Sequence, residues 1–148
     1  MNSAAIRALH LNTMRGRLSV STSGIVYGHN AGKNTISVAA TPAPAAYPNF
    51  FSATNVVESF SSDGLRKIFY NPDSTAITPG NFLFGSNGGT TLQKPDLTAA
   101  DGTNTSVAGF IPFYGTSAAA HHAAAIAALV KSKIPGLNAA QIKAALNA

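Results

Sequence analysis

The stretch that decides the fold runs from residue 115 to residue 124 and reads Gly-Thr-Ser-Ala-Ala-Ala-His-His-Ala-Ala. Almost every residue from Ala118 to Ala128 is Ala, His or Ile, and Ala has the highest helix propensity of all residues. This composition predicts a helix from near Ser117 to about Ser132. Because the helix is apolar on every side, we expect it to be buried on every side.

Ser117 lies where this helix is predicted to begin. The first N–H groups of a helix have no partner inside it, and the helix dipole favours negative charge there. The oxyanion of an acyl-transfer intermediate suits that position, so Ser117 can act as a nucleophile whose own N–H is an oxyanion donor. Gly115 permits a tight turn before it. The alternative is that Ser117 is an ordinary N-cap, a role that serine often fills.

Two further elements can be predicted from the sequence. Residues 35–40 form a short β-branched and small apolar run between Asn34 and Pro42, which is typical of a buried strand. Asn138 with Gln141 three residues later forms a capping-box pattern, which predicts the start of a second helix. Strand pieces that alternate with long helices favour an α/β fold with a parallel sheet.

The overall composition is that of a protein built from small residues. Of the 148 residues, 45% are hydrophobic and only 10% are charged, against roughly 25% charged residues in an ordinary soluble domain. The length permits one small domain with a packed core. The same composition fits a piece of a larger enzyme whose surface is covered by the missing part, and it also fits an Ala-rich domain of another kind.

Composition and motifs also argue against several partners and sites. The chain has no cysteine, which leaves neither a disulfide nor a thiolate metal site, and we expect no metal and no cofactor. The net charge of +5 is scattered, so no nucleic-acid partner is expected. The apolar run from Ala118 to Val130 is too short to span a membrane. No secretory signal follows Met1, and the compartment is left open.

The segment around Ser117 closely resembles the nucleophile motif of subtilisin-like serine proteases (peptidase S8/S53 type), in which Gly-Thr-Ser is followed by small residues. Upstream, Lys94-Pro95-Asp96 resembles the Lys-Pro-Asp strand of that family. The segment 60–64 resembles the Phe-Ser-Ser turn of that family. The segment 27–40 resembles the strand that follows the oxyanion asparagine, together with the residues that lead into that strand. These blocks occur in family order.

The resemblance implies an organisation for the whole chain. Residues 24–148 are expected to be the C-terminal part of a subtilisin-like peptidase domain, and residues 1–23 form a poorly assigned N-terminal segment. The implied fold is a partial α/β domain in which parallel strands pack with a buried Ala-rich helix that begins at the nucleophile serine.

The function that the resemblance implies is endopeptidase action on a protein or peptide substrate. In that family the serine attacks the scissile carbonyl, a histidine takes its proton and an aspartate orients the histidine. Ser117 is the residue that matches the first role. The catalytic Asp and His of the family lie well upstream of the serine and are missing from this sequence. The isolated chain is therefore expected to be inactive, and the missing N-terminal part of the domain is an expected partner.

Two other classes of function remain open. The chain can be a catalytically inactive fragment, a scaffold or a binding remnant of such a protease. It can also be an Ala-rich binding domain unrelated to proteases, which would make the ordered blocks a coincidence.

The sequence departs from the resembled family at several positions. The oxyanion asparagine should lie shortly before Gly28, where Asn12 is the only nearby candidate. His121 replaces the usual proline, and Asp101 stands where the family usually turns with proline. The local geometry at both positions is therefore an open question.

The two adjacent histidines of the predicted helix have different interpretations. His122 matches a family histidine that is not catalytic, and we expect it to be a buried, hydrogen-bonded residue. His121 follows Ser117 by four residues, so it could share a helical face with the serine and act as its base. A serine at the mouth of a helix points outward, however, which would misalign this pair for proton transfer.

Overall fold

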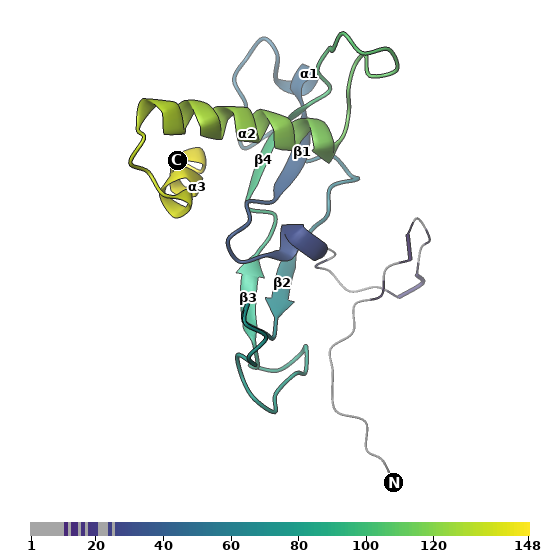
Figure 1. Ribbon diagram of the computed structural model, residues 1–148. Helices are drawn as coiled ribbons and strands as arrows, with labels where there is room; N and C mark the ends of the chain where they lie inside the picture. Colours follow the sequence, from purple (N-terminus) through teal and green to yellow (C-terminus); the bar gives the residue numbers. More distant parts are fainter. Residues whose placement is uncertain (1–10, 12, 15, 17, 21–23, 25) are drawn as a thin grey trace.

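The computed structural model describes residues 11, 13, 14, 16, 18–20, 24 and 26–148 (Figure 1). In chain order its elements are η1 (Gly28–Ala31), β1 (Val38–Pro42), α1 (Ala43–Ala46), β2 (Leu65–Ile68), β3 (Thr90–Gln93), β4 (Leu97–Asp101), α2 (Thr116–Lys133) and α3 (Ala139–Leu146). This mixture of helices and strands, with a parallel pair among the strands, confirms the predicted α/β class.

The parallel pair consists of β1 and β4, aligned from Val38 opposite Leu97 to Pro42 opposite Asp101. The predicted strand at residues 35–40 began three residues too early. Before β1, the backbone N–H of Ser37 is bound by a side chain of the Lys-Pro-Asp segment and not by a neighbouring strand. The strand continues instead to Pro42, whose missing N–H is tolerated at a strand end.

The outer edge of β1 is partly covered by the Phe-Ser-Ser turn. The Ala40 N–H donates to Ser61 Oγ at 3.0 Å, and the Ala40 carbonyl accepts from the Glu58 N–H at 2.8 Å. The Thr41 hydroxyl adds a hydrogen bond to the Val56 carbonyl. These contacts place residues 56–61 beside β1, on the edge opposite β4.

Helix α2 lies across β1 and β4 and also contacts α3 (Figure 1). It buries Ala118, Ala119 and Ala123, whose small side chains let its backbone lie close to the strands. Other apolar side chains of α2 are exposed, and Leu129 keeps 70% of its surface in solvent. The prediction of a helix buried on every side is therefore wrong for this chain, because the elements that α2 contacts cover only part of its circumference.

The packed core is small. The buried hydrophobic residues among those described are one valine and seven alanines: Val26, Ala31, Ala39, Ala40, Ala46, Ala118, Ala119 and Ala123. Many larger apolar side chains are exposed, among them Tyr47 and Phe50. In the described part of the chain, no helix has both the length and the apolar character needed to cross a bilayer.

The capping box predicted for the second helix is present at the start of α3. The Gln141 N–H donates to Asn138 Oδ1 at 3.0 Å, and the Asn138 N–H donates to Gln141 Oε1 at 2.9 Å. Lys131, in the last turn of α2, donates to the carbonyls of Pro135 and Leu137. The connection between the two helices is therefore fixed by a side chain as well as by the cap.

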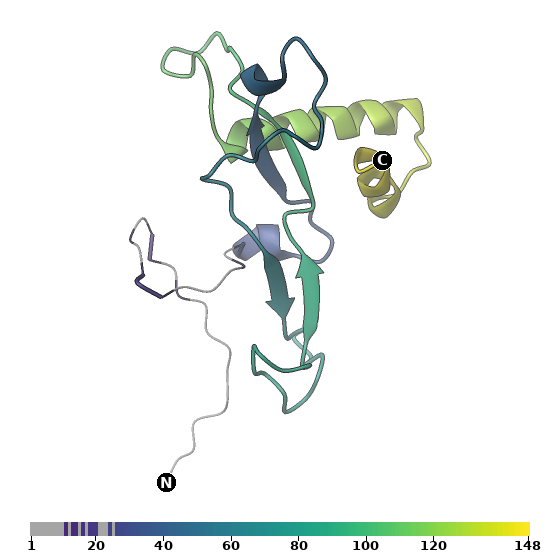
Figure 2. The ribbon, with the colours of Figure 1, turned by 180° about the vertical axis from the view of Figure 1, so that it is seen from behind.

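Strands β2 and β3 form an antiparallel hairpin that extends away from α2 (Figure 2). The register runs from Leu65 opposite Gln93 to Ile68 opposite Thr90. In the loop between the strands, the Phe82 ring stacks on Tyr70 with centroids 5.4 Å apart. The sequence prediction contained the parallel strands but not this hairpin.

Asp96, just before β4, joins three parts of the fold. Its side chain is fully buried and forms ion pairs with Lys94, at 2.6 Å, and with Lys143 of α3. It also accepts hydrogen bonds from the N–H and the hydroxyl of Ser37, at 2.7 and 3.0 Å. Lys94 is itself buried and donates to the Thr35 carbonyl as well. The segment before β1, the start of β4, and α3 therefore share one carboxylate.

The pKa of Asp96 predicts how the stability of the chain depends on pH. Burial raises this pKa, but hydrogen bonds from Lys143, Lys94 and Ser37 outweigh burial and lower it from 3.8 to about 2. The carboxylate therefore stabilises the fold above pH 4, and this contribution, about 2 kcal/mol, is lost as the pH falls from about 4 to 2. Chemical unfolding followed by circular dichroism at several pH values measures it. In an Asp96→Asn variant this part of the pH dependence should be absent, and an unchanged slope would contradict the assignment.

Candidate active site

Ser117 is the second residue of α2 and is exposed to solvent. The N-cap position is occupied by Gly115, and no side chain caps the helix there. The interpretation of Ser117 as an ordinary N-cap is therefore wrong. Gly115 has a φ of 141°, in a region that residues with a side chain rarely adopt, so the tight turn before the serine requires glycine.

The segment that leads into α2 is tied to the end of β4. The Gly102 N–H donates to the Phe113 carbonyl, and the Phe113 N–H donates to the Thr103 carbonyl, both at 2.8 Å. The Gly115 N–H donates to Asp101 Oδ2 at 2.7 Å. The 13 residues between Asp101 and Gly115 therefore form a closed loop, and the start of α2 is held next to the carboxyl end of β4.

The first N–H groups of α2 remain outside the helical hydrogen-bond ladder. That ladder starts with the Ala119 N–H, which donates to the Gly115 carbonyl at 3.2 Å. The N–H of Ser117 therefore precedes the ladder, as an oxyanion donor must. No acidic residue lies in the first turn of α2, and Lys131 and Lys133 lie in its last turn. The negative charge at the N-terminal end of the helix comes instead from the Asp101 carboxylate, which accepts the N–H of the N-cap Gly115.

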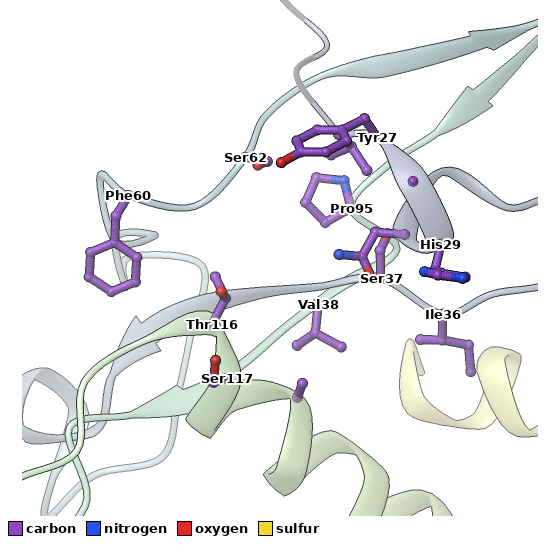
Figure 3. Close-up of a pocket in the computed structure, with 14 residues that line it drawn as sticks. Tyr27, His29, Ile36, Ser37, Val38, Phe60, Ser62, Pro95, Thr116 and Ser117 are labelled. Carbon is purple, nitrogen blue, oxygen red and sulfur yellow. The ribbon is translucent and has the colours of Figure 1, made fainter. Parts of the chain in front are cut away.

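A cavity of about 600 Å³ lies beside Ser117 (Figure 3). This volume is within the usual range for a site that holds a small ligand or part of a larger one. Its walls come from segments far apart in the sequence: Val26 to Asn30, Ile36 to Val38, Phe60, Ser62, Pro95, Thr116, Ser117 and Ala120. The segments that resemble the subtilisin-like family therefore line one cavity, and Ser117 is part of its wall.

The histidines differ in their relation to Ser117. His121 Nδ1 lies 2.6 Å from the backbone carbonyl oxygen of Ser117, so this nitrogen is engaged with the backbone and not with the hydroxyl. His122 Nδ1 donates to the Ala100 carbonyl at 2.7 Å, which confirms a hydrogen-bonded residue, although its ring is half-buried. His29 lines the cavity. His10 lies outside the described residues.

The groups that would activate the serine are not found in the described part of the chain. There, the Ser117 hydroxyl has no hydrogen-bond partner, and no Asp or Glu side chain lines the cavity. The oxyanion candidate Asn12 lies outside the described residues. Among the described residues, no three His, Cys, Asp or Glu side chains come together in a way that could hold a metal ion.

Sequence reasoning assigned no role to two residues of this region, His29 and Asp101. His29 lines the cavity and belongs to the segment 27–40, whose resemblance to the family strand after the oxyanion asparagine was the available signal. For Asp101, the sequence left the local geometry of the turn open. The structure places Asp101 fully buried at the end of β4, where its carboxylate binds the backbone of Gly115. The turn at this position therefore relies on a side-chain hydrogen bond and not on a proline.

Comparison with known proteins identifies a family. A family model described as the subtilase family, peptidase S8, matches residues 8–148. Searches of curated proteins and of solved structures give no match. The resemblance inferred from the motifs is thereby confirmed at the level of the family.

Proposed function

Because the chain belongs to the subtilase family, we propose that it supplies the nucleophile of a serine endopeptidase and that Ser117 is the attacking residue. The observation that carries the proposal is the setting of Ser117. It is exposed in the first turn of α2, and it lines the cavity formed by the family-like blocks.

The proposed chemistry follows from this setting. Ser117 Oγ attacks the carbonyl carbon of a protein or peptide substrate while its proton passes to a histidine. The carbonyl oxygen becomes an oxyanion beside the Ser117 N–H, which is free of the helical ladder. Collapse of the tetrahedral intermediate then breaks the C–N bond as the histidine gives its proton to the leaving amine, and water hydrolyses the acyl-enzyme that remains.

The base and its orienting carboxylate are proposed to come from a separate N-terminal part of the domain. Support for this comes from the free Ser117 hydroxyl and from the absence of an acidic cavity wall in the described part of the chain. The same observations favour a second candidate function, that of an inactive remnant of a protease that retains only a scaffold or binding role.

Labelling with a fluorophosphonate tests the proposal. The probe is applied to the product of the whole reading frame, including any in-frame sequence upstream of Met1, and the adduct is located by mass spectrometry. We expect an adduct on Ser117 that is lost in Ser117→Ala. Ser62→Ala is the matched control, because Ser62 lines the same cavity and its loss should leave labelling intact. An adduct on another serine would contradict the assignment, and no adduct would favour the inactive remnant.

A further inference from the structure

Asp101, at the end of β4, is fully buried. Its Oδ2 atom accepts the Gly115 N–H at 2.7 Å, while its Oδ1 atom is buried and has no partner among the described residues. An unpaired buried polar atom destabilises a fold by about 1–3 kcal/mol, and a charged one by more. Such an arrangement requires a reason beyond packing.

The position of Asp101 suggests what that reason is. It is the last residue of β4 and lies opposite Pro42 of β1, so its backbone is held by the parallel pair. Its hydrogen-bond partner Gly115 is the N-cap of α2, two residues before Ser117. The carboxylate therefore connects a strand end directly to the turn that precedes the serine.

Asp101 supplies the side-chain hydrogen bond of that turn, in addition to the backbone hydrogen bonds of the loop and the bond from His122 Nδ1 of α2 to the Ala100 carbonyl. The two backbone hydrogen bonds between residues 102–103 and Phe113 lie farther from Ser117. Gly115 adopts a strained φ, and no side chain caps α2 from within the helix. Of the hydrogen bonds that tie the loop to β4, the one from Asp101 lies nearest to the serine.

We propose that Asp101 is a positioning residue for Ser117. By holding the Gly115 N–H, the carboxylate sets the plane of the peptide that enters α2. The direction of the first helical turn follows from that plane, and with it the orientation of the Ser117 N–H and hydroxyl toward the cavity. This inference rests on the proposed role of Ser117, but its geometry can be tested without peptide hydrolysis.

A single thiol at position 117 can report on this geometry. The chain has no cysteine, so a Ser117→Cys variant carries one thiol. A thiol at a helix N-terminus has a pKa below the ~8.5 of a free cysteine. Its pKa is measured from the pH dependence of alkylation by iodoacetamide, in the Ser117→Cys chain and in the same chain with Asp101→Asn or Asp101→Ala.

The comparison of the two Asp101 variants isolates the hydrogen bond. Both remove the charge, but only the Asn amide oxygen can still accept the Gly115 N–H. We expect the thiol pKa to be higher with Asp101→Ala than with Asp101→Asn by about half a unit, or about threefold in alkylation rate below the pKa. Equal pKa values in two variants of equal helix content would overturn the proposal.

A second measurement covers the case in which Asp101→Ala does not fold. Amide hydrogen exchange of Gly115 is followed by NMR in the unsubstituted chain and in Asp101→Asn. Protection of this amide in both supports the proposal, and rapid exchange in the unsubstituted chain overturns it. Neither readout depends on catalysis, so a failure of Ser117 labelling and a failure of the Asp101 proposal would be distinguished.

Discussion

Purified as the 148-residue chain alone, the protein is expected to hydrolyse peptide substrates no faster than its Ser117→Ala variant. The described residues provide a serine and an oxyanion N–H, but no base bound to the serine. In subtilisin, which belongs to this family, loss of the catalytic histidine or serine lowers turnover by about 10⁶. Loss of a side-chain oxyanion donor lowers it by roughly 10² to 10³. A fluorogenic peptide assay with both proteins at equal concentration measures the difference.

A measurable rate that Ser117→Ala abolishes would contradict this expectation. It would mean that the chain contains a working base, and the histidines to test first are the one that lines the same cavity and the one a helical turn after the serine. His29→Ala and His121→Ala would then distinguish a base across the cavity from a base on the same helix. Retention of circular dichroism at 222 nm in each variant is the control for folding.

The largest effect on stability is expected from Asp96→Ala. This change removes the carboxylate from the buried Lys94 ammonium, which keeps only the Thr35 carbonyl as a partner among those described. Breaking one side of a buried ion pair typically destabilises a protein by about 3–5 kcal/mol. The apolar core of the described chain consists almost entirely of alanines, so a loss of this size is expected to lower the urea unfolding midpoint strongly. Urea unfolding followed by circular dichroism measures the loss.

Asp73→Ala is the matched control for Asp96→Ala. Asp73 is an exposed aspartate that accepts hydrogen bonds from the nearby Thr75, so its loss should shift the unfolding midpoint far less. Lys143→Met should also have a smaller effect than Asp96→Ala, because the Lys143 side chain is 38% exposed and Lys94 still pairs with the carboxylate. Equal midpoints for Asp96→Ala and Asp73→Ala would contradict the structural role of the buried ion pairs.

The features predicted from sequence are those that depend on local chemistry. The helix at Ser117 was predicted within one residue of its start and end, because a long run of alanines favours a helix in nearly any context. The capping box at Asn138 was predicted because both of its hydrogen bonds join residues three apart.

The features that were missed depend on contacts between distant segments. The strands β2 and β3 are short and carry mixed polar and apolar residues, so no alternation reveals them. The role of Asp101 depends on Gly115, 14 residues away, and no spacing rule connects a strand end to a helix cap across a loop. Both required the three-dimensional arrangement.

The exposure of α2 shows a different limit of sequence reasoning. An apolar helix surface indicates that something can cover it, but it does not indicate whether the covering atoms belong to the same chain. Ala118, Ala119 and Ala123 meet strands of this chain, whereas Ile126 and Leu129 are exposed. Composition alone could not separate these two groups of residues.

The parallel pairing of β1 with β4 also has a consequence for the order of folding. The hydrogen bond between Ser37 and Asp96, at the start of this pair, joins residues 59 positions apart. Closing a long loop is slow, because its entropy is lost before the contacts form. The β2–β3 hairpin lies inside that loop. Once Leu65 is paired with Gln93, the path along the chain that must still close between Ser37 and Asp96 is roughly half as long. The hairpin extends away from α2 and contributes no residue to the cavity wall. We nevertheless expect it to form early and to speed assembly of the sheet that supports Ser117.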